Sequence, residues 1–119
     1  MDLSDREKIE KIIRDRKLAN GFYLKKSEVF RKFIAFEEKA FEAGSLGCMD
    51  KELIAVGISV VINCESCMQW HITQAMKQGA TEEQVIEAIG VGIEMGGGPA
   101  TVSARFAMMV LEYNKLSDS

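Results

Sequence analysis

The chain has 119 residues, a length that suits one domain with a single hydrophobic core and excludes a multidomain architecture. We therefore expect one domain over residues 1–119. Hydrophobic residues make up 47% of the chain and charged residues 28%, which is too apolar for a disordered protein. The formal net charge of -3 gives no electrostatic reason to bind nucleic acid or an anionic membrane.

The chain lacks the marks of a membrane or secreted protein. Its most apolar stretch, residues 53–62, is shorter than the roughly 18 residues of a spanning helix. Residues 1–8 are charged where a secretory signal would be apolar, and three cysteines do not form a paired set. We expect a cytoplasmic protein, in which a close cysteine pair is catalytic or metal-binding rather than structural.

Apolar residues in the first half recur at helical spacing, which predicts an all-α bundle. A first helix is predicted over residues 5–20, opened by a capping box at residues 4–7 and ended by Gly21. Ser27 is predicted to cap a second helix that ends at Gly44. We interpret the apolar stripe of this second helix as core; it comprises Val29, Phe30, Phe33, Ile34, Phe36, Ala40 and Phe41.

The second half predicts four more helices, giving about six in all. Asp50 is predicted to cap a third, apolar helix; its β-branched residues would also suit a strand, but no partner strand is visible. A fourth helix is predicted from about Cys64 to Gln78. Residues 81–84 form a capping-box pattern for a fifth, and Pro99 suits the first turn of a last helix after three glycines.

Charge is unevenly distributed along the chain. Residues 1–52 carry 12 basic and 11 acidic side chains, whereas residues 53–119 carry only 3 and 7. A bundle built from the second half has little charge to cover its surface, so we expect it to self-associate.

The segment whose side chains could take part in a reaction contains Cys64, Cys67 and His71. At about 100° per residue, these three side chains share one narrow face of an α-helix. Cys67 and His71 are four residues apart, which places a thiol nucleophile beside a base, and a helix N-terminus would favour a Cys64 thiolate. The pair therefore supports thiol-disulfide exchange, or attack on a peroxide through a sulfenic acid.

Other interpretations of these residues stay open. Zinc could bind Cys64, Cys67 and His71 if Cys48 or Glu52 completed the site. The two thiols could be buried and inert, in a non-catalytic protein that binds a partner through its helical surface. From the sequence pattern alone, Glu52 would be a solvated carboxylate in the first turn of a helix. Cys48 would be a buried or partly buried spare thiol, or a third redox partner.

The spacing Glu52-x11-Cys64-x2-Cys67-x3-His71 resembles the motif of the alkylhydroperoxidase D-like branch of the carboxymuconolactone decarboxylase family. The flanks also resemble that family, at residues 51–55 and 79–85 within a core of residues 25–112. Members are all-helical and assemble as trimers or hexamers. The resemblance implies a homotrimer or homohexamer. The sequence itself shows no fingerprint of an organic cofactor, and we expect neither a cofactor nor a bound metal.

For mechanism, the resemblance implies a proton relay from Cys67 through His71 to Glu52. Cys67 would attack the substrate, a small disulfide or a hydroperoxide, and Cys64 would then close the Cys64–Cys67 disulfide. An external thiol donor, thioredoxin-like or lipoyl, would reduce that disulfide. The helix dipole instead favours Cys64 as the attacking thiol, so the order stays open. Peroxidase members often carry histidine where this chain has Ser66. We therefore rank disulfide reduction at least as high as peroxide reduction as the predicted activity.

Overall fold

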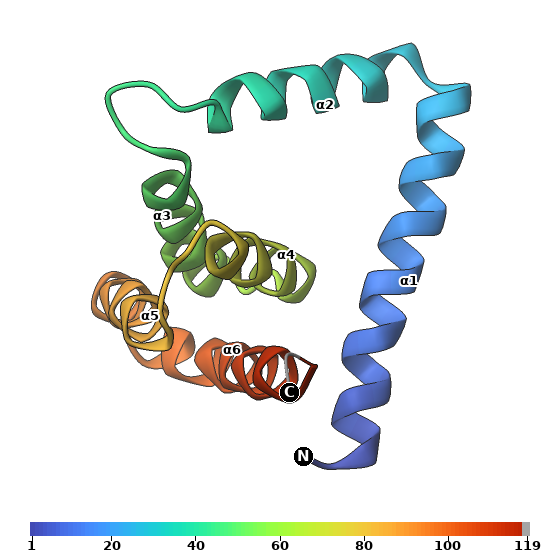
Figure 1. Ribbon diagram of the computed structural model, residues 1–119. Helices are drawn as coiled ribbons and strands as arrows, with labels where there is room; N and C mark the ends of the chain where they lie inside the picture. Colours follow the sequence, from blue (N-terminus) through green and yellow to red (C-terminus); the bar gives the residue numbers. More distant parts are fainter. Residues whose placement is uncertain (118–119) are drawn as a thin grey trace.

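The computed structural model describes residues 1–117 and consists of six α-helices joined by short connections (Figure 1). The helices are α1 (Leu3–Lys26), α2 (Glu28–Phe41), α3 (Cys48–Val61), α4 (Glu65–Lys77), α5 (Glu82–Gly96) and α6 (Gly98–Ser117). No strand occurs in this part of the chain, which confirms the predicted all-α fold. Within residues 1–117, each helix is too short or too polar to cross a bilayer.

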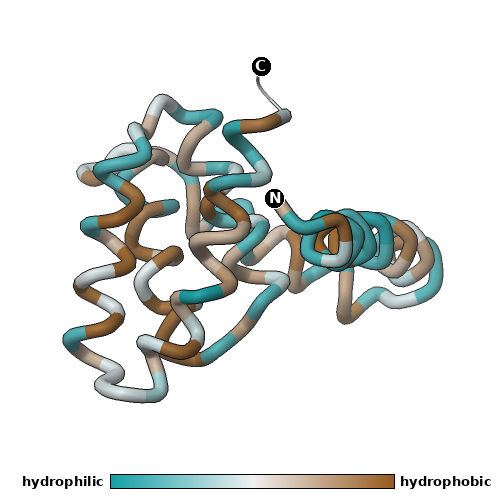
Figure 2. Tube along the Cα trace, turned by 90° about the horizontal axis from the view of Figure 1, so that it is seen from below, coloured by the Kyte–Doolittle hydropathy of each residue, from teal (hydrophilic) through white to brown (hydrophobic). Residues whose placement is uncertain are grey.

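Helices α3 to α6 form a bundle, and α1 and α2 form an arm beside it. Within the bundle α3 contacts α4, α5 and α6, so it is the central element. Helix α1 runs along one side against α4 and α6, and α2 crosses from α1 to α3. Figure 2 shows the arm standing next to the bundle rather than wrapped around it. Its one fully buried residue, Ile9, joins the core formed by the other helices.

Local caps confirm several predicted helix boundaries. The Ser27 hydroxyl accepts a hydrogen bond from the Phe30 amide and opens α2. Thr81 and Gln84 form the predicted reciprocal capping box of α5. Gly97, at φ 71°, lies in the left-handed region that glycine adopts without strain, and it separates α5 from α6.

The predicted limits of the first helix are wrong at both ends. Asp2, rather than a capping box at Ser4, is the N-cap, because its carboxylate accepts the Ser4 amide at 2.8 Å. The helix continues through Gly21 to Lys26. A helical glycine costs only about 1 kcal/mol relative to alanine, so it does not end a helix without a left-handed turn. Gly21 has no such turn.

Two further boundaries differ from the prediction. Helix α2 ends at Phe41 rather than Gly44, and α3 begins at Cys48 with Gly47 as its N-cap. Asp50 therefore lies inside the first turn of α3 and does not cap it. The helix predicted there, as opposed to a strand, is confirmed.

The prediction that the apolar stripe of α2 is core is also wrong. No residue of α2 is buried, and the side chains of Val29, Phe33 and Phe36 are 80%, 54% and 70% exposed. The physical reason is the position of α2, which spans the gap between α1 and α3 instead of packing inside the bundle. Hydropathy marks a helix face that favours burial, but it does not identify what covers that face.

Helices α3 and α5 approach closely at two glycines, and this contact sets a testable stability difference. A Cβ added at Gly92 would lie 2.6 Å from the Gly57 carbonyl oxygen, whereas one at Gly90 would meet nothing within 4 Å. Gly92→Ala is expected to lower the free energy of unfolding by about 1–3 kcal/mol through overpacking. Gly90→Ala, the matched control, is expected to raise it by about 0.5–1 kcal/mol through helix propensity. Thermal unfolding followed by circular dichroism measures both; equal shifts in Tm would contradict the close contact.

Candidate functional site

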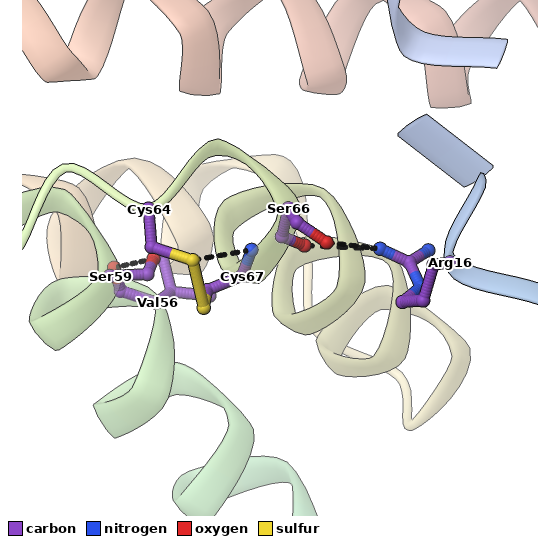
Figure 3. The surroundings of a disulfide bond; sticks show 6 residues. All are labelled: Arg16, Val56, Ser59, Cys64, Ser66 and Cys67. Carbon is purple, nitrogen blue, oxygen red and sulfur yellow. Dashed lines mark hydrogen bonds between the residues drawn. A yellow bond between two sulfur atoms is a disulfide. The ribbon is translucent and has the colours of Figure 1, made fainter. Parts of the chain in front are cut away.

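Cys64 and Cys67 lie at the N-terminus of α4 and are joined by a disulfide, with their Cα atoms 5.1 Å apart (Figure 3). Cys64 is the N-cap residue, and its sulfur accepts a hydrogen bond from the Cys67 amide at 3.1 Å. The Cys64 amide donates to the Ser59 carbonyl at the end of α3, after a turn in which Asn63 has a φ of 54°. The predicted placement of Cys64 at a helix N-terminus is confirmed.

His71 and Glu52 form a buried pair between α4 and α3. The His71 Nδ1 atom lies 3.0 Å from a Glu52 carboxylate oxygen, and Glu52 is only 5% exposed. The interpretation of Glu52 as a solvated first-turn carboxylate is therefore wrong. Because a carboxylate oxygen accepts hydrogen bonds, this contact favours the neutral tautomer with a proton on Nδ1 and a lone pair on Nε2. The Phe41 ring stacks on the imidazole, with ring centroids 5.2 Å apart, and further restricts its orientation.

A cavity of about 190 Å³, here called the α4 cavity, lies where α1, α2 and α4 meet. It brings Cys67 and His71 onto one wall, next to Trp70. The remaining lining residues come from all three helices: Arg16, Asn20, Phe30, Phe33, Ile34, Glu37 and Ser66. A cysteine and a histidine thus line the same small space. Cys64 and Glu52 contact Cys67 and His71 but do not line the cavity.

A larger cavity of about 490 Å³ lies between α3 and α5, away from the sulfur atoms. Its lining is apolar throughout, formed by Leu53, Ile54, Gly57, Ile58, Val61, Ala88, Val91, Gly92 and Met95. No side chain there can transfer a proton or an electron pair. The titratable side chains lie instead in the wall of the smaller α4 cavity.

The structure gives no geometric support to the zinc alternative. Within residues 1–117, no three His, Cys, Asp or Glu side chains are grouped so that they could hold a metal ion. Cys48, the suggested fourth ligand, is a half-buried free thiol at the start of α3. It forms no disulfide in this structure, and its role as a third redox partner stays untested.

Sequence reasoning missed Arg16, which reaches from α1 to the disulfide segment. Its Nη1 atom donates to the backbone and side-chain oxygens of Ser66, both at 3.1 Å (Figure 3). The two residues are 50 positions apart, and Arg16 lies in the predicted first helix among many other charged residues. No local signal could have distinguished it from its neighbours.

Comparisons with known proteins identify related sequences. The model of the carboxymuconolactone decarboxylase family matches residues 27–108. An uncharacterized protein of Cupriavidus necator is 44% identical over 69 residues, 58% of this chain and 61% of that protein. Uncharacterized protein 4 in the cox locus of Paracoccus denitrificans is 40% identical over 80 residues, 67% of this chain and 72% of that protein.

Solved structures show the same arrangement of helices. An apo protein of the same family from Legionella pneumophila superposes with a TM-score of 0.79 at 28% identity, covering 90% of this chain and 97% of that one. A Thermotoga maritima family protein, for which involvement in an antioxidative response has been suggested, gives a TM-score of 0.84 at 23% identity. That alignment covers 91% of this chain and 92% of that one, and at this identity it supports the fold alone.

Proposed function

Because this chain belongs to the carboxymuconolactone decarboxylase family, we propose that it is a thiol-disulfide oxidoreductase that reduces a small disulfide or a hydroperoxide. The observation that carries the proposal is the Cys64–Cys67 disulfide at the edge of a cavity that also contains His71. A pair of cysteines at a helix N-terminus, with a carboxylate-bound imidazole nearby, is suited to reversible two-electron chemistry.

In the proposed reaction, His71 Nε2 takes the proton of the reduced Cys67 thiol and Glu52 stabilises the resulting imidazolium. The Cys67 thiolate attacks one sulfur of a disulfide RSSR, which releases one thiolate and leaves a mixed disulfide on Cys67. Cys64 then attacks the Cys67 sulfur, releases the second thiolate and closes the Cys64–Cys67 bond. With a hydroperoxide, Cys67 becomes a sulfenic acid as the alcohol leaves, and closure by Cys64 releases water.

The structure supports Cys67 as the attacking thiol, because Cys67 lines the α4 cavity and Cys64 does not. Cys64 acts in the second half of the catalytic cycle, when a thiol donor reduces the disulfide. When a thiol donor attacks the Cys67 sulfur of the disulfide, Cys64 leaves as a thiolate that accepts the Cys67 amide and faces the N-terminus of α4. A stabilised leaving group speeds this step. The helix dipole thus acts on Cys64, and the proton relay through His71 acts on Cys67.

The exposed apolar side chains support the proposal that copies of this chain associate. The stripe on α2 and the cavity between α3 and α5 both present hydrophobic side chains to solvent. Burying such surfaces is the usual reason that a small helical protein forms a homo-oligomer. A homotrimer or homohexamer remains our proposal.

Counting thiols before and after oxidation tests the proposed function. The fully reduced chain has three thiols. One equivalent of a small disulfide or of a hydroperoxide is expected to leave one, at Cys48, because the other two sulfurs join intramolecularly. Peptide mapping by mass spectrometry should then show Cys64 linked to Cys67. Finding only links between separate chains, or no oxidation by either acceptor, would refute the proposal. Turnover with thioredoxin-like, lipoyl and low-molecular-weight thiols identifies the electron donor.

A further inference from the structure

Arg16 occupies the wall of the α4 cavity next to the segment that carries Cys67. Its Nη1 atom binds both oxygens of Ser66, and its Nη2 atom donates to the Gln69 side-chain oxygen. The guanidinium carbon lies 5.0 Å from the centroid of the Trp70 ring. These contacts orient the guanidinium firmly, and every partner is electrically neutral.

The positive charge of Arg16 has no counter-ion among the residues that the structure describes. Among residues 1–117 no carboxylate lies within ion-pair distance of it, whereas nearby Lys8 pairs with Glu65 at 2.9 Å. Burial lowers the pKa of the Arg16 guanidinium, which shows that the charge is partly removed from water. In the same part of the chain, Arg16 Nε has no hydrogen-bond partner. A partly desolvated, uncompensated cation is stabilised when an anion enters beside it.

The rest of the cavity limits the size and shape of that anion. At about 190 Å³ the α4 cavity is smaller than pockets for drug-sized ligands. Phe30, Phe33 and Ile34 supply an apolar wall, and Asn20 adds a neutral polar group. Glu37 also lines the cavity and opposes an anion that approaches it. The space suits a short aliphatic chain with a single charged end near Arg16.

We propose that Arg16 is a specificity-determining residue that selects disulfides carrying a carboxylate a few atoms from the reacting sulfur. The inference rests on the proposed function, and it adds a substrate class to it. The carboxylate binds the free donors of the guanidinium while Cys67 attacks the sulfur, so binding and reaction occur in the same cavity. The reaction balances as one enzyme dithiol plus RSSR giving the Cys64–Cys67 disulfide plus two RSH.

Single-turnover oxidation of the reduced protein tests this selectivity without a donor thiol. Three disulfides of similar length serve as probes: 3,3′-dithiodipropionate is anionic, bis(2-hydroxyethyl) disulfide is neutral and cystamine is cationic. The second-order rate constant is expected to be about tenfold higher for the anionic probe than for the neutral one, and lowest for the cationic one. Equal rates for the three probes, or a preference for cystamine, would overturn the inference.

Variants assign the selectivity to a residue. Arg16→Gln is expected to abolish the preference, so that the anionic and neutral probes oxidise this variant at rates within about threefold of each other. Arg16→Lys keeps the charge and should restore part of the preference. The matched control is Glu37→Gln in the same cavity, which should keep or increase it. Circular dichroism checks that each variant is folded, and a preference that survives Arg16→Gln in folded protein would refute the assignment.

A binding measurement keeps the inference testable even if no disulfide reacts. Trp70 is the only tryptophan, and it contacts Arg16, so its fluorescence reports occupation of the cavity. The redox-inert thioether 3,3′-thiodipropionate is expected to change the fluorescence of the wild type but not of Arg16→Gln, and neutral 2,2′-thiodiethanol should change neither. Binding that depends on Arg16 without any oxidation would refute the proposed function alone. Oxidation without charge discrimination would refute the inference alone.

Discussion

Cys67→Ser is expected to lower kcat/KM for both disulfide and hydroperoxide acceptors by about a thousandfold or more. A serine hydroxyl is not ionised near neutral pH and cannot form a bond to sulfur that is reversible by thiols. Cys64→Ser is also expected to abolish multiple turnover, but for a different reason. Cys67 can still attack once, so one equivalent of mixed disulfide or sulfenic acid should accumulate on it.

Mass spectrometry after a single oxidation separates the two cysteines. We expect a sulfenic-acid probe to label Cys67 in Cys64→Ser and to label nothing at position 64 in Cys67→Ser. Cys48→Ser is the matched control, because it removes a half-buried thiol outside the disulfide and should leave turnover within about twofold. Labelling that persists only in Cys67→Ser would show that Cys64 attacks first.

Glu52→Gln is expected to lower kcat by about 10² to 10⁴ while KM changes little. The amide fills the same space, but it lacks the charge that stabilises the His71 imidazolium and fixes the Nδ1 tautomer. His71→Asn removes the base itself and should have an effect of similar size. Since the two residues act as one unit, the double variant should be no slower than the slower single variant.

The control for this experiment is Glu65→Gln. Glu65 is a carboxylate next to Cys64 in sequence, but it is exposed and pairs with Lys8 at the surface. Its loss is expected to change kcat by less than about twofold, because exposed ion pairs contribute little. A Glu52→Gln variant that folds, as judged by circular dichroism, and retains wild-type kcat would rule out a relay through Glu52.

The parts of the fold that short-range signals specify were predictable. Ser27 and the Thr81–Gln84 pair bond to amides within three residues, so their sequence alone indicates where α2 and α5 begin. Gly97 and Pro99 likewise separate α5 from α6 through their own backbone preferences. The Cys64-x-x-Cys67 pair was predictable for the same reason, since one helical turn brings the two residues together.

Contacts between helices could not be predicted from local signals, because they depend on how the helices cross. The Glu52–His71 pair joins α3 to α4, and from the sequence only the resemblance to a family implied it. Nothing in the stripe around Phe33 shows that α2 lies on an arm with little to cover it. Arg16 meets Ser66 only because α1 packs along α4.

The sequence by itself determined the six helices, the N-caps of α2 and α5 and the proximity of Cys64 to Cys67, because hydrogen bonds and side-chain spacing within a turn are local. Tertiary structure alone decided the burial of Glu52, the exposure of α2 and the position of Arg16 in the wall of the α4 cavity. These features depend on the positions of whole helices, which the summed packing of the core sets and which no short segment encodes.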